Sequence, residues 1–304
     1  MRVSVVVPCY RSAATLPRLV EGLVGVLPEV ADGFEVVLVV DGSPDDTWLV
    51  AKGLAGEHEE VRAIRLARNY GQHNAVIAGV RSAQYEIVVT MDDDLQHPAD
   101  QVPVLLRALR DDVDLVYGVP VKEEHGLARN FSSRLVKRAM ASAMAVREAR
   151  SISAFRAFRT ELREGFERLD GPQPSVDVAL SWSTTRIAQT TVQMDARTIG
   201  RSNYTTWMLV KHALTMITGY SVEPLRLIGY LGLVCVLLGL GLLVATIVQV
   251  VAGDAGGITA IAAMVAVFAG AQMVALGVLG EYVGRLHSGS TGRPTYVIRE
   301  REGD

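Results

Sequence analysis

Three consecutive aspartates, Asp92, Asp93 and Asp94, lie in the segment VVTMDDDLQHP at residues 88–98. Adjacent carboxylates repel one another, so a folded chain keeps such a cluster where a cation or a ligand offsets the charge. Side chains at positions i and i+2 of an extended segment point the same way. Asp92 and Asp94 can therefore reach one cation while Asp93 faces elsewhere, and carboxylate oxygens suit Mg²⁺ or Mn²⁺. The alternative is a solvated acidic turn.

The composition of the 304-residue chain limits the possible functions. Its formal net charge is −3, which does not favour nucleic acid as a partner. Apolar residues are concentrated between Leu225 and Tyr282, whereas residues 1–200 have the composition of a globular domain. The two cysteines, Cys9 and Cys235, are spaced neither as a metal site nor as a disulfide framework.

The segments that must position the aspartates alternate between strand and helix. Short β-branched runs are typical of buried strands, and the run from Leu16 to Leu27 has apolar residues at helical spacing, with Ser12 as a candidate cap. This alternation predicts an α/β fold of the Rossmann-like type, with a mainly parallel sheet and helices on both faces. Ligands of such sheets bind beyond the carboxyl ends of the strands, where the aspartates fall. The predicted strands are Val3–Val7, Phe34–Val40, Val61–Leu66, Ile87–Met91 and Leu115–Val119, with shorter strands in SISAFRAFR (151–159) and TTVQM (190–194), and a basic helix is predicted at 126–146.

Two long apolar segments close the chain. Leu225–Val251 carries no charge beyond Arg226, and Ile258–Gly280 is uncharged. A helix of about 20 apolar residues spans a bilayer, so the two segments predict a transmembrane hairpin. Basic residues flank this hairpin, whereas Asp254 is the one charged residue of the connecting loop, and the positive-inside rule then predicts that both termini are cytoplasmic. A buried helical pair in a soluble core is the alternative.

The segment Asn203–Tyr220 places Trp207 and Leu214 on one helical face, which predicts an amphipathic helix on the membrane surface. An ordinary domain helix is the alternative. The predicted organisation is that of a multi-pass protein of the inner (plasma) membrane. It comprises a cytoplasmic domain at 1–200, a juxtamembrane helix at 201–224, two transmembrane helices within 225–284 (about 225–251 and 258–282), and a cytoplasmic tail at 285–304.

Four motifs follow one another at predicted strand ends or helix starts: VVVPCYRS (5–12), VLVVDGSPDDT (37–47), LARNYGQHNAVIAGV (66–80) and MDDDLQHP (91–98). This ordered set resembles family 2 glycosyltransferases, which have the GT-A nucleotide-sugar fold. DDDLQHP is similar to the D-x-D-L-Q-x-P motif of the branch that makes polyprenyl-phosphate sugars, which includes dolichol-phosphate mannose synthases. The apolar hairpin, GRSNYTTW (200–207) and GRPTY (292–296) resemble the bacterial undecaprenyl-phosphate transferases of that branch. The Q-x-x-R-W signature of processive polysaccharide synthases is absent from the sequence.

The resemblance implies a metal-dependent, inverting enzyme. It would move a single sugar from a nucleotide-diphosphate sugar to a polyprenyl (undecaprenyl) phosphate at the cytoplasmic membrane face, with Mg²⁺ or Mn²⁺ as cofactor. A homo-oligomer, with a tetramer as the candidate form, is also implied, and nucleic acid is not expected as a partner. Asp92 and Asp94 would hold the metal that bridges the donor diphosphate, with Gln96 near the same ion.

The remaining roles follow from matching positions. Pro8 and Tyr10 would line the base pocket, Asp41 would accept a hydrogen bond from the base or ribose, and Arg68 and Gly71 would lie beside the nucleotide. The catalytic set would comprise Asp92, Asp94, Arg129 and Ser133, the last two in an R-x-x-x-S pattern that handles phosphates. Arg134, Lys137 and Arg201 would help bring together the donor diphosphate and the lipid phosphate, which are both anions. Ser202 and Tyr204 lie in GRSNYTTW, which matches the family motif at the lip of the site. Structural roles remain open for several of them, since Pro8 could end a strand, Tyr10 could pack, and Arg129 and Arg134 could form a solvated or headgroup-facing basic surface.

One position departs from the family pattern. Relatives often carry Asp before the Phe-Arg of the segment that reads SISAFRAFR here, and Ala154 stands in that place. A lipid phosphate is already a nucleophile at neutral pH, because its second pKa is about 6, so transfer to it needs no strong base. A hydroxyl acceptor such as diacylglycerol would need one. The alternatives are therefore transfer to another lipid, a degenerate transferase that serves as a membrane scaffold, and a small transporter or flippase subunit.

Overall fold

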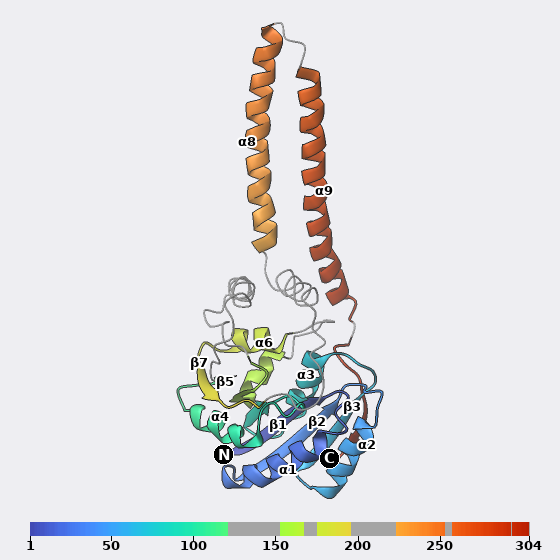
Figure 1. Ribbon diagram of the computed structural model, residues 1–304, viewed down its shortest axis with the longest axis vertical. Coiled ribbons are helices and arrows are strands. Elements are labelled where there is room, and N and C mark those ends of the chain that lie inside the picture. Colours follow the sequence, from blue (N-terminus) through green and yellow to red (C-terminus); the bar gives the residue numbers. More distant parts are fainter. Residues whose placement is uncertain (121–152, 167–174, 196–222, 253–256, 293, 304) are drawn as a thin grey trace.

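The computed structural model describes residues 1–120, 153–166, 175–195, 223–252, 257–292 and 294–303. The helix predicted at 126–146 and the juxtamembrane helix predicted at 201–224 lie outside these ranges, apart from the last two residues of the second. The described chain forms an α/β domain and a helical hairpin that extends from it (Figure 1).

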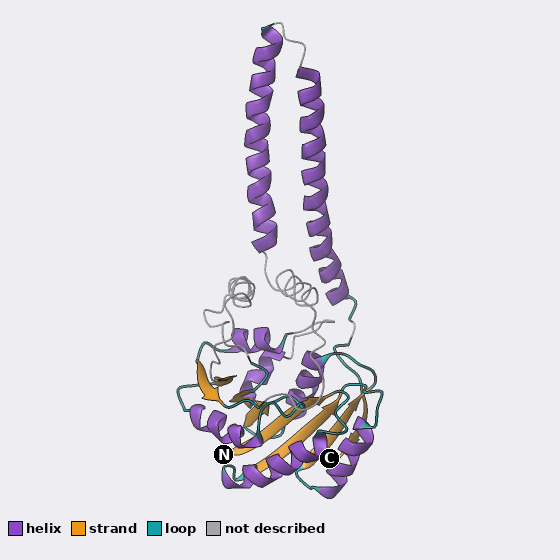
Figure 2. Cartoon of the chain, viewed as in Figure 1, coloured by secondary structure: helices purple, strands orange, loops and turns teal. Residues whose placement is uncertain are grey.

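Eight strands of the described chain form one mixed sheet in the order β7-β5-β6-β4-β1-β2-β3-β8. Figure 2 shows the strands in orange, with helices around them. The central strand β1 pairs in parallel with β2 and with β4, so that Val5 lies opposite Val36 on one side and Val89 on the other. β6 runs antiparallel to both neighbours, and β8 runs antiparallel to β3. The predicted fold class, α/β with a mainly parallel sheet, is confirmed. The strands are β1 Arg2–Cys9, β2 Gly33–Val40, β3 Val61–Leu66, β4 Ile87–Thr90, β5 Leu115–Pro120, β6 Arg156–Arg159, β7 Ile187–Val192 and β8 Ile298–Glu302.

Helices cover both faces of the sheet because its central strands are apolar on both sides. Val5 and Val7 of β1 belong to the core beneath α1, α2 and α4, and Val6 belongs to the core beneath α3 and α6. In Figure 1, α3 and α6 lie on the hairpin side of the sheet, and α1 and α2 lie on the far side. The helices are α1 Leu16–Val26, α2 Thr47–Glu57, α3 Gln72–Ser82, α4 Val102–Ala108, α6 Val176–Ser183, α8 Glu223–Val251 and α9 Gly257–Ser290, with 3-10 turns at Leu27–Glu29, Ala99–Gln101 and Thr160–Phe166.

One local prediction is wrong, and one predicted strand has shifted bounds. Ser12 does not cap α1, because that helix begins after Thr15 and the Ser12 hydroxyl donates a hydrogen bond to Asp93. The strand predicted at 190–194 is β7 at Ile187–Val192, because the sheet partner β5 pairs in register from Ile187 onward. In both cases a contact from a distant segment decides the boundary.

The C-terminal strand β8 has the sequence IRERE, whose charges give no strand signal. It pairs with β3, and Arg65 and Lys52 of the domain form ion pairs with Glu300 at 3.0 Å and with Glu302 at 3.1 Å. The predicted tail therefore contains an edge strand of the sheet, and the chain after the hairpin is tied back to the domain.

The hairpin consists of α8 and α9. Within them, Ile228–Gln249 has a mean hydropathy of 2.8 and Val267–Gly284 one of 1.4, so both are long and apolar enough to cross a bilayer. Only 6% of the first segment and none of the second is buried within the described structure. This exposure argues against the alternative of a helical pair buried in a soluble core, and it suggests association with a membrane.

Candidate active site

Two adjoining cavities lie beyond the carboxyl ends of β1 and β4. We name the larger the aspartate cavity; it encloses about 260 Å³ and is lined by Pro8, Cys9, Tyr10, Asp41, Asn69, Gly71, Gln72, Asp92, Asp93 and Asp94. We name the smaller the arginine cavity; it encloses about 170 Å³ and is lined by Pro8, Gln72, His73, Val76, Thr90, Met91, Asp92, Ala154, Arg156 and Asp177. Pro8, Gln72 and Asp92 line both, so the two cavities meet at the Asp92 carboxylate.

The three aspartates follow β4, which ends at Thr90. Asp93 accepts hydrogen bonds from the backbone N–H of Tyr10, at 3.1 Å, and from the Ser12 hydroxyl. Burial raises the pKa of the Asp93 carboxyl, and the nearby Asp94 carboxylate adds to that shift, while these hydrogen bonds oppose it. Asp93 thus ties the loop after β4 to the loop after β1.

Asp94 and Gln96 are linked within this loop. The backbone N–H of Gln96 donates to Asp94 Oδ1 at 3.1 Å, while the Gln96 carbonyl oxygen accepts from the N–H of Asp195. Leu95 adopts a left-handed backbone conformation with φ of 61°, which turns the chain sharply between them. The described contacts of Gln96 in this loop are therefore made by its backbone.

Asp41 follows β2 and holds the loop that precedes α3. Its two carboxylate oxygens accept hydrogen bonds from the backbone N–H groups of Tyr70 and Gly71, each at 2.7 Å. Burial raises the pKa of the Asp41 carboxyl, and the two N–H donors and the Arg68 guanidinium act in the opposite direction. Asp41 therefore shapes this wall of the aspartate cavity.

Gly42 lets the Asp41 loop approach residues 68–69. Its φ is +56°, and an added Cβ would lie 2.2 Å from the carbonyl carbon of Arg68. We expect Gly42→Ala to lower the free energy of unfolding by roughly 2–4 kcal/mol, because the backbone would be both strained and displaced. Denaturant unfolding of the full chain in detergent measures this free energy.

Gly53→Ala is the matched control. The added Cβ would meet nothing within 4 Å on α2, so the substitution should raise the free energy of unfolding by up to about 1 kcal/mol. Similar unfolding midpoints for the two variants would contradict the expectation.

Many of the site residues predicted from the sequence meet in this structure. Arg68 and Gln96 lie outside the cavity linings, and the Arg68 guanidinium lies over the Tyr70 ring at 4.5 Å from its centre. The aspartate cavity brings together Pro8, Tyr10, Asp41, Gly71, Asp92 and Asp94. Arg129, Ser133, Arg134, Lys137, Arg201, Ser202 and Tyr204 lie outside the described residues.

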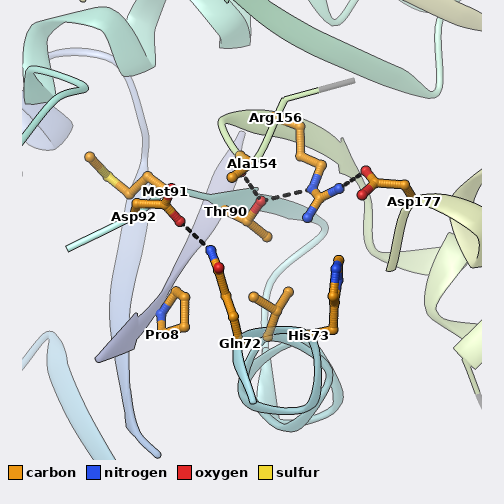
Figure 3. A pocket seen from close by; sticks show the side chains of 10 residues that line it. Pro8, Gln72, His73, Thr90, Met91, Asp92, Ala154, Arg156 and Asp177 are labelled. Atoms are coloured by element: carbon orange, nitrogen blue, oxygen red, sulfur yellow. Dashed lines mark hydrogen bonds and ion pairs between the residues drawn. The ribbon is translucent and has the colours of Figure 1, made fainter. Parts of the chain in front are cut away.

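The arginine cavity contains groups that sequence reasoning missed (Figure 3). Arg156 of β6 donates from Nε to Thr90 Oγ1 at 3.0 Å and forms an ion pair with Asp177 of α6. The Thr90 hydroxyl in turn donates to the Ala154 carbonyl oxygen at 2.7 Å. Gln72 of α3 donates to Asp92 Oδ1 at 2.6 Å. No sequence signal joins Arg156 to Asp177, since 20 residues separate them.

Comparison with known families decides the class of the protein. The model for glycosyl transferase family 2 matches residues 4–167, just over half of the chain. The chain belongs to glycosyltransferase family 2. A second model, the GtrB C-terminal hairpin, matches residues 223–286, which include α8 and most of α9. The resemblance predicted from the ordered motifs is therefore confirmed, and the protein is a glycosyltransferase.

Curated relatives match this family 2 glycosyltransferase along almost its whole length. The undecaprenyl-phosphate 4-deoxy-4-formamido-L-arabinose transferase of Yersinia enterocolitica is 30% identical over 98% of this chain and 93% of its own. The protein of the same name from Yersinia pestis is 28% identical with the same coverage. These relatives lie in the polyprenyl-phosphate branch that the sequence predicts.

Solved structures share the fold of this family 2 glycosyltransferase at low sequence identity. Glucosyl-3-phosphoglycerate synthase from Mycobacterium tuberculosis, solved with Mn²⁺ and UDP, is 20% identical over 71% of this chain and 77% of its own, with a TM-score of 0.52. The mannosyltransferase PcManGT from Pyrobaculum calidifontis, solved with GDP-Man and Mn²⁺, is 20% identical over 72% of this chain and 63% of its own, with a TM-score of 0.53. Both support the GT-A fold.

Proposed function

We propose that this glycosyltransferase moves a single sugar, with inversion, from a nucleotide-diphosphate sugar to a polyprenyl (undecaprenyl) phosphate at the cytoplasmic membrane face. The observation that carries the proposal is the presence of Asp92 and Asp94 in one cavity at the strand ends, in a chain that continues into a GtrB-type hairpin. The relatives named as undecaprenyl-phosphate sugar transferases share both parts of the chain.

Asp92 and Asp94 would bind Mg²⁺ or Mn²⁺. Among the described residues no group of three or more His, Cys, Asp or Glu side chains could hold a metal. Two carboxylates nevertheless fit Mg²⁺, which binds through one or two carboxylates together with water and substrate phosphates. The metal would neutralise the charge that develops on the leaving nucleoside diphosphate. Gln96 remains a predicted neighbour of the ion, and the Mn²⁺ in the two similar folds supports a divalent cation.

The lipid phosphate would attack the sugar directly. Its oxygen is anionic at neutral pH, so no side chain has to remove a proton, and Ala154 in the arginine cavity is compatible with this reaction. A single displacement from the face opposite the leaving diphosphate inverts the anomeric centre. Cationic side chains would only have to bring two anions together, and Arg129, Arg134, Lys137 and Arg201 are proposed for that task, with Ser133 beside the phosphates.

The hairpin would hold the catalytic domain where the lipid headgroup lies. We propose that α8 and α9 cross the inner membrane and that both termini are cytoplasmic, since basic residues flank the hairpin and Asp254 lies in its loop. Ser202 and Tyr204 would then line the membrane-side lip of the site. A homo-oligomer is part of the proposal, and light scattering of the detergent-solubilised protein measures whether its molar mass is that of a tetramer.

Gln72 provides a test of the metal site that leaves both aspartates in place. Its amide holds Asp92 Oδ1 at 2.6 Å, and groups that orient metal ligands typically change metal affinity by about 10- to 100-fold. We expect Gln72→Ala to raise the Mn²⁺ concentration for half-maximal activity by about 10-fold or more. Gln84→Ala, an exposed position remote from both cavities, serves as the control and should leave the Mn²⁺ requirement unchanged. Equal Mn²⁺ requirements in the two variants would count against a role of Gln72 in the metal site.

A donor screen on the purified full chain in detergent tests the function. The reaction contains undecaprenyl phosphate, Mg²⁺ or Mn²⁺ and a panel of nucleotide sugars, with released nucleoside diphosphate and lipid product identified by mass. A lipid-linked sugar that forms from one donor, disappears with EDTA and is cleaved by mild acid supports the proposal. A product that survives mild acid would indicate a glycoside of another lipid. Nucleotide binding without any product would favour a scaffold.

A further inference from the structure

The arginine cavity adjoins the proposed metal site without being part of the metal-binding loop. Asp92 forms its border with the aspartate cavity, and its far wall is formed by Arg156 and Asp177 (Figure 3). A sugar attached to a diphosphate at Asp92 and Asp94 would extend from the aspartate cavity into an adjoining space. The arginine cavity, which is polar and encloses about 170 Å³, is such a space.

The ion pair at the far wall is buried and well fixed. The side chains of Arg156 and Asp177 are 3% and 13% exposed. Thr90 accepts from Arg156 Nε at 3.0 Å, and the Tyr117 hydroxyl donates to Asp177 Oδ1 at 3.3 Å. Burial is the main cause that raises the pKa of the Tyr117 hydroxyl, so the phenol stays protonated and remains a donor. These contacts from β4, β5 and β6 hold the pair in one orientation.

The pair still has hydrogen-bonding capacity on the cavity side. The hydrogen bonds of Asp177 use Oδ1, and those of Arg156 to Thr90 and Asp177 use Nε and one terminal nitrogen; within the described ranges no group donates to Asp177 Oδ2. Figure 3 shows both groups above the His73 ring. His73 Nδ1 accepts from the N–H of Val176 at 3.4 Å, so in the neutral ring the proton lies on Nε2.

This arrangement distinguishes between classes of sugar. A carboxylate oxygen beside guanidinium N–H groups offers one acceptor and one donor, which is the pattern that neighbouring hydroxyl groups satisfy. The charge of Arg156 is already balanced by Asp177, so the carboxylate of an anionic sugar at this wall would find no unbalanced side-chain cation and would meet the Asp177 carboxylate. Leaving such a charge unpaired in a buried site is costly.

We propose that the arginine cavity holds the transferred sugar, and that Asp177 and Arg156 select an uncharged, hydroxyl-bearing sugar over a uronic acid. The inference rests on the proposed function and adds the class of sugar and the residues that determine it. Asp177 and Arg156 act on specificity through direct contact with the sugar, whereas Tyr117 and Thr90 are positioning residues.

The test compares ligands that differ in one carboxylate. The nucleoside diphosphate that binds the full chain with Mn²⁺ is identified first by calorimetry, with UDP and GDP as probes. The matching pair is then measured: UDP-glucose and UDP-glucuronic acid, or GDP-mannose and GDP-mannuronic acid. We expect the wild type to bind the neutral sugar at least 10-fold more tightly than the uronic acid. In Asp177→Asn this preference should fall at least 10-fold, because Arg156 becomes free to pair with the uronate.

Glu35→Gln is the matched control. It also converts a buried carboxylate beside an arginine, Arg62, into an amide, but it lies at the start of β2, outside both cavities. Its sugar preference should equal that of the wild type. Binding of the free nucleoside diphosphate to Asp177→Asn should stay within about 2-fold of wild type, which shows that the variant is folded.

Three results would overturn the inference. A wild type that binds both sugars equally contradicts it without any variant. An unchanged preference in Asp177→Asn, with a raised KM for undecaprenyl phosphate, would assign the cavity to the acceptor headgroup. Failure of the wild type to bind either nucleoside diphosphate with Mn²⁺, together with no product from any donor in the screen, would overturn the proposed function and the inference together, whereas nucleotide binding without discrimination between sugars overturns the inference alone.

Discussion

Asp94→Asn is expected to lower kcat/KM for sugar transfer by about 10³-fold or more, because a carboxylate that neutralises the metal and the departing diphosphate is lost. Asn retains an oxygen that can accept the hydrogen bond from the Gln96 N–H, so the loop after β4 should keep its conformation. The measurement is initial-rate transfer to undecaprenyl phosphate with Mn²⁺ titrated over several decades. We expect Asp94→Asn to fold normally but to lose its activation by Mn²⁺.

Asp46→Asn is the control for this prediction. It removes the same charge from an exposed position before α2, where the side chain forms no capping hydrogen bond. Its activity should remain within about 2-fold of wild type, since an exposed charge outside the cavity contributes little. If Asp94→Asn kept more than a tenth of the activity with an unchanged Mn²⁺ requirement, the assignment of Asp94 to the metal would be wrong.

Glu35→Ala is expected to lower the free energy of unfolding by about 3–5 kcal/mol, because it removes the buried carboxylate that pairs with the buried Arg62 guanidinium. Glu35 and Arg62 are 4% and 9% exposed and are joined at 2.8 Å across β2 and β3. Glu35 Oε1 also accepts from the Ser4 hydroxyl at 2.6 Å and from the Gln84 N–H at 2.7 Å. The substitution therefore removes the acceptor of three hydrogen-bond donors: the Arg62 guanidinium, the Ser4 hydroxyl and the Gln84 N–H.

Denaturant unfolding in detergent, followed by the fluorescence of the domain, measures this loss. Glu86→Ala provides the comparison, because Glu86 forms an ion pair with Arg2 at 3.2 Å in which both side chains are about half exposed. An exposed pair contributes only about 0–1 kcal/mol, so the two variants should differ clearly. Losses of the same size in both variants would show that the Arg62–Glu35 pair is not the reason for the destabilisation.

The polar network near the site illustrates how far sequence reasoning reaches. Asp92 and Asp94 were identifiable as a pair because their spacing and chemistry are local, and both line the aspartate cavity. The role of Asp93, which joins two loops by hydrogen bonds, could not be predicted from the sequence, because its partners Tyr10 and Ser12 lie about 80 residues away in the chain. Arg156 and Asp177 were missed for the same reason, since they belong to β6 and α6 and meet only when the sheet has formed.

The sequence by itself determined the alternation of strands and helices, the two apolar spans and the ordered motifs, because each depends on periodicity or composition within a short window. The family model and the full-length relatives confirm the class that these motifs predict. Only the tertiary structure decided that β8 is part of the sheet, because the charged segment IRERE becomes a strand through hydrogen bonds to β3 and ion pairs to Arg65 and Lys52. It also decided which polar groups face the arginine cavity. Such contacts depend on the distance between residues in space, and no local pattern of residue types records that distance.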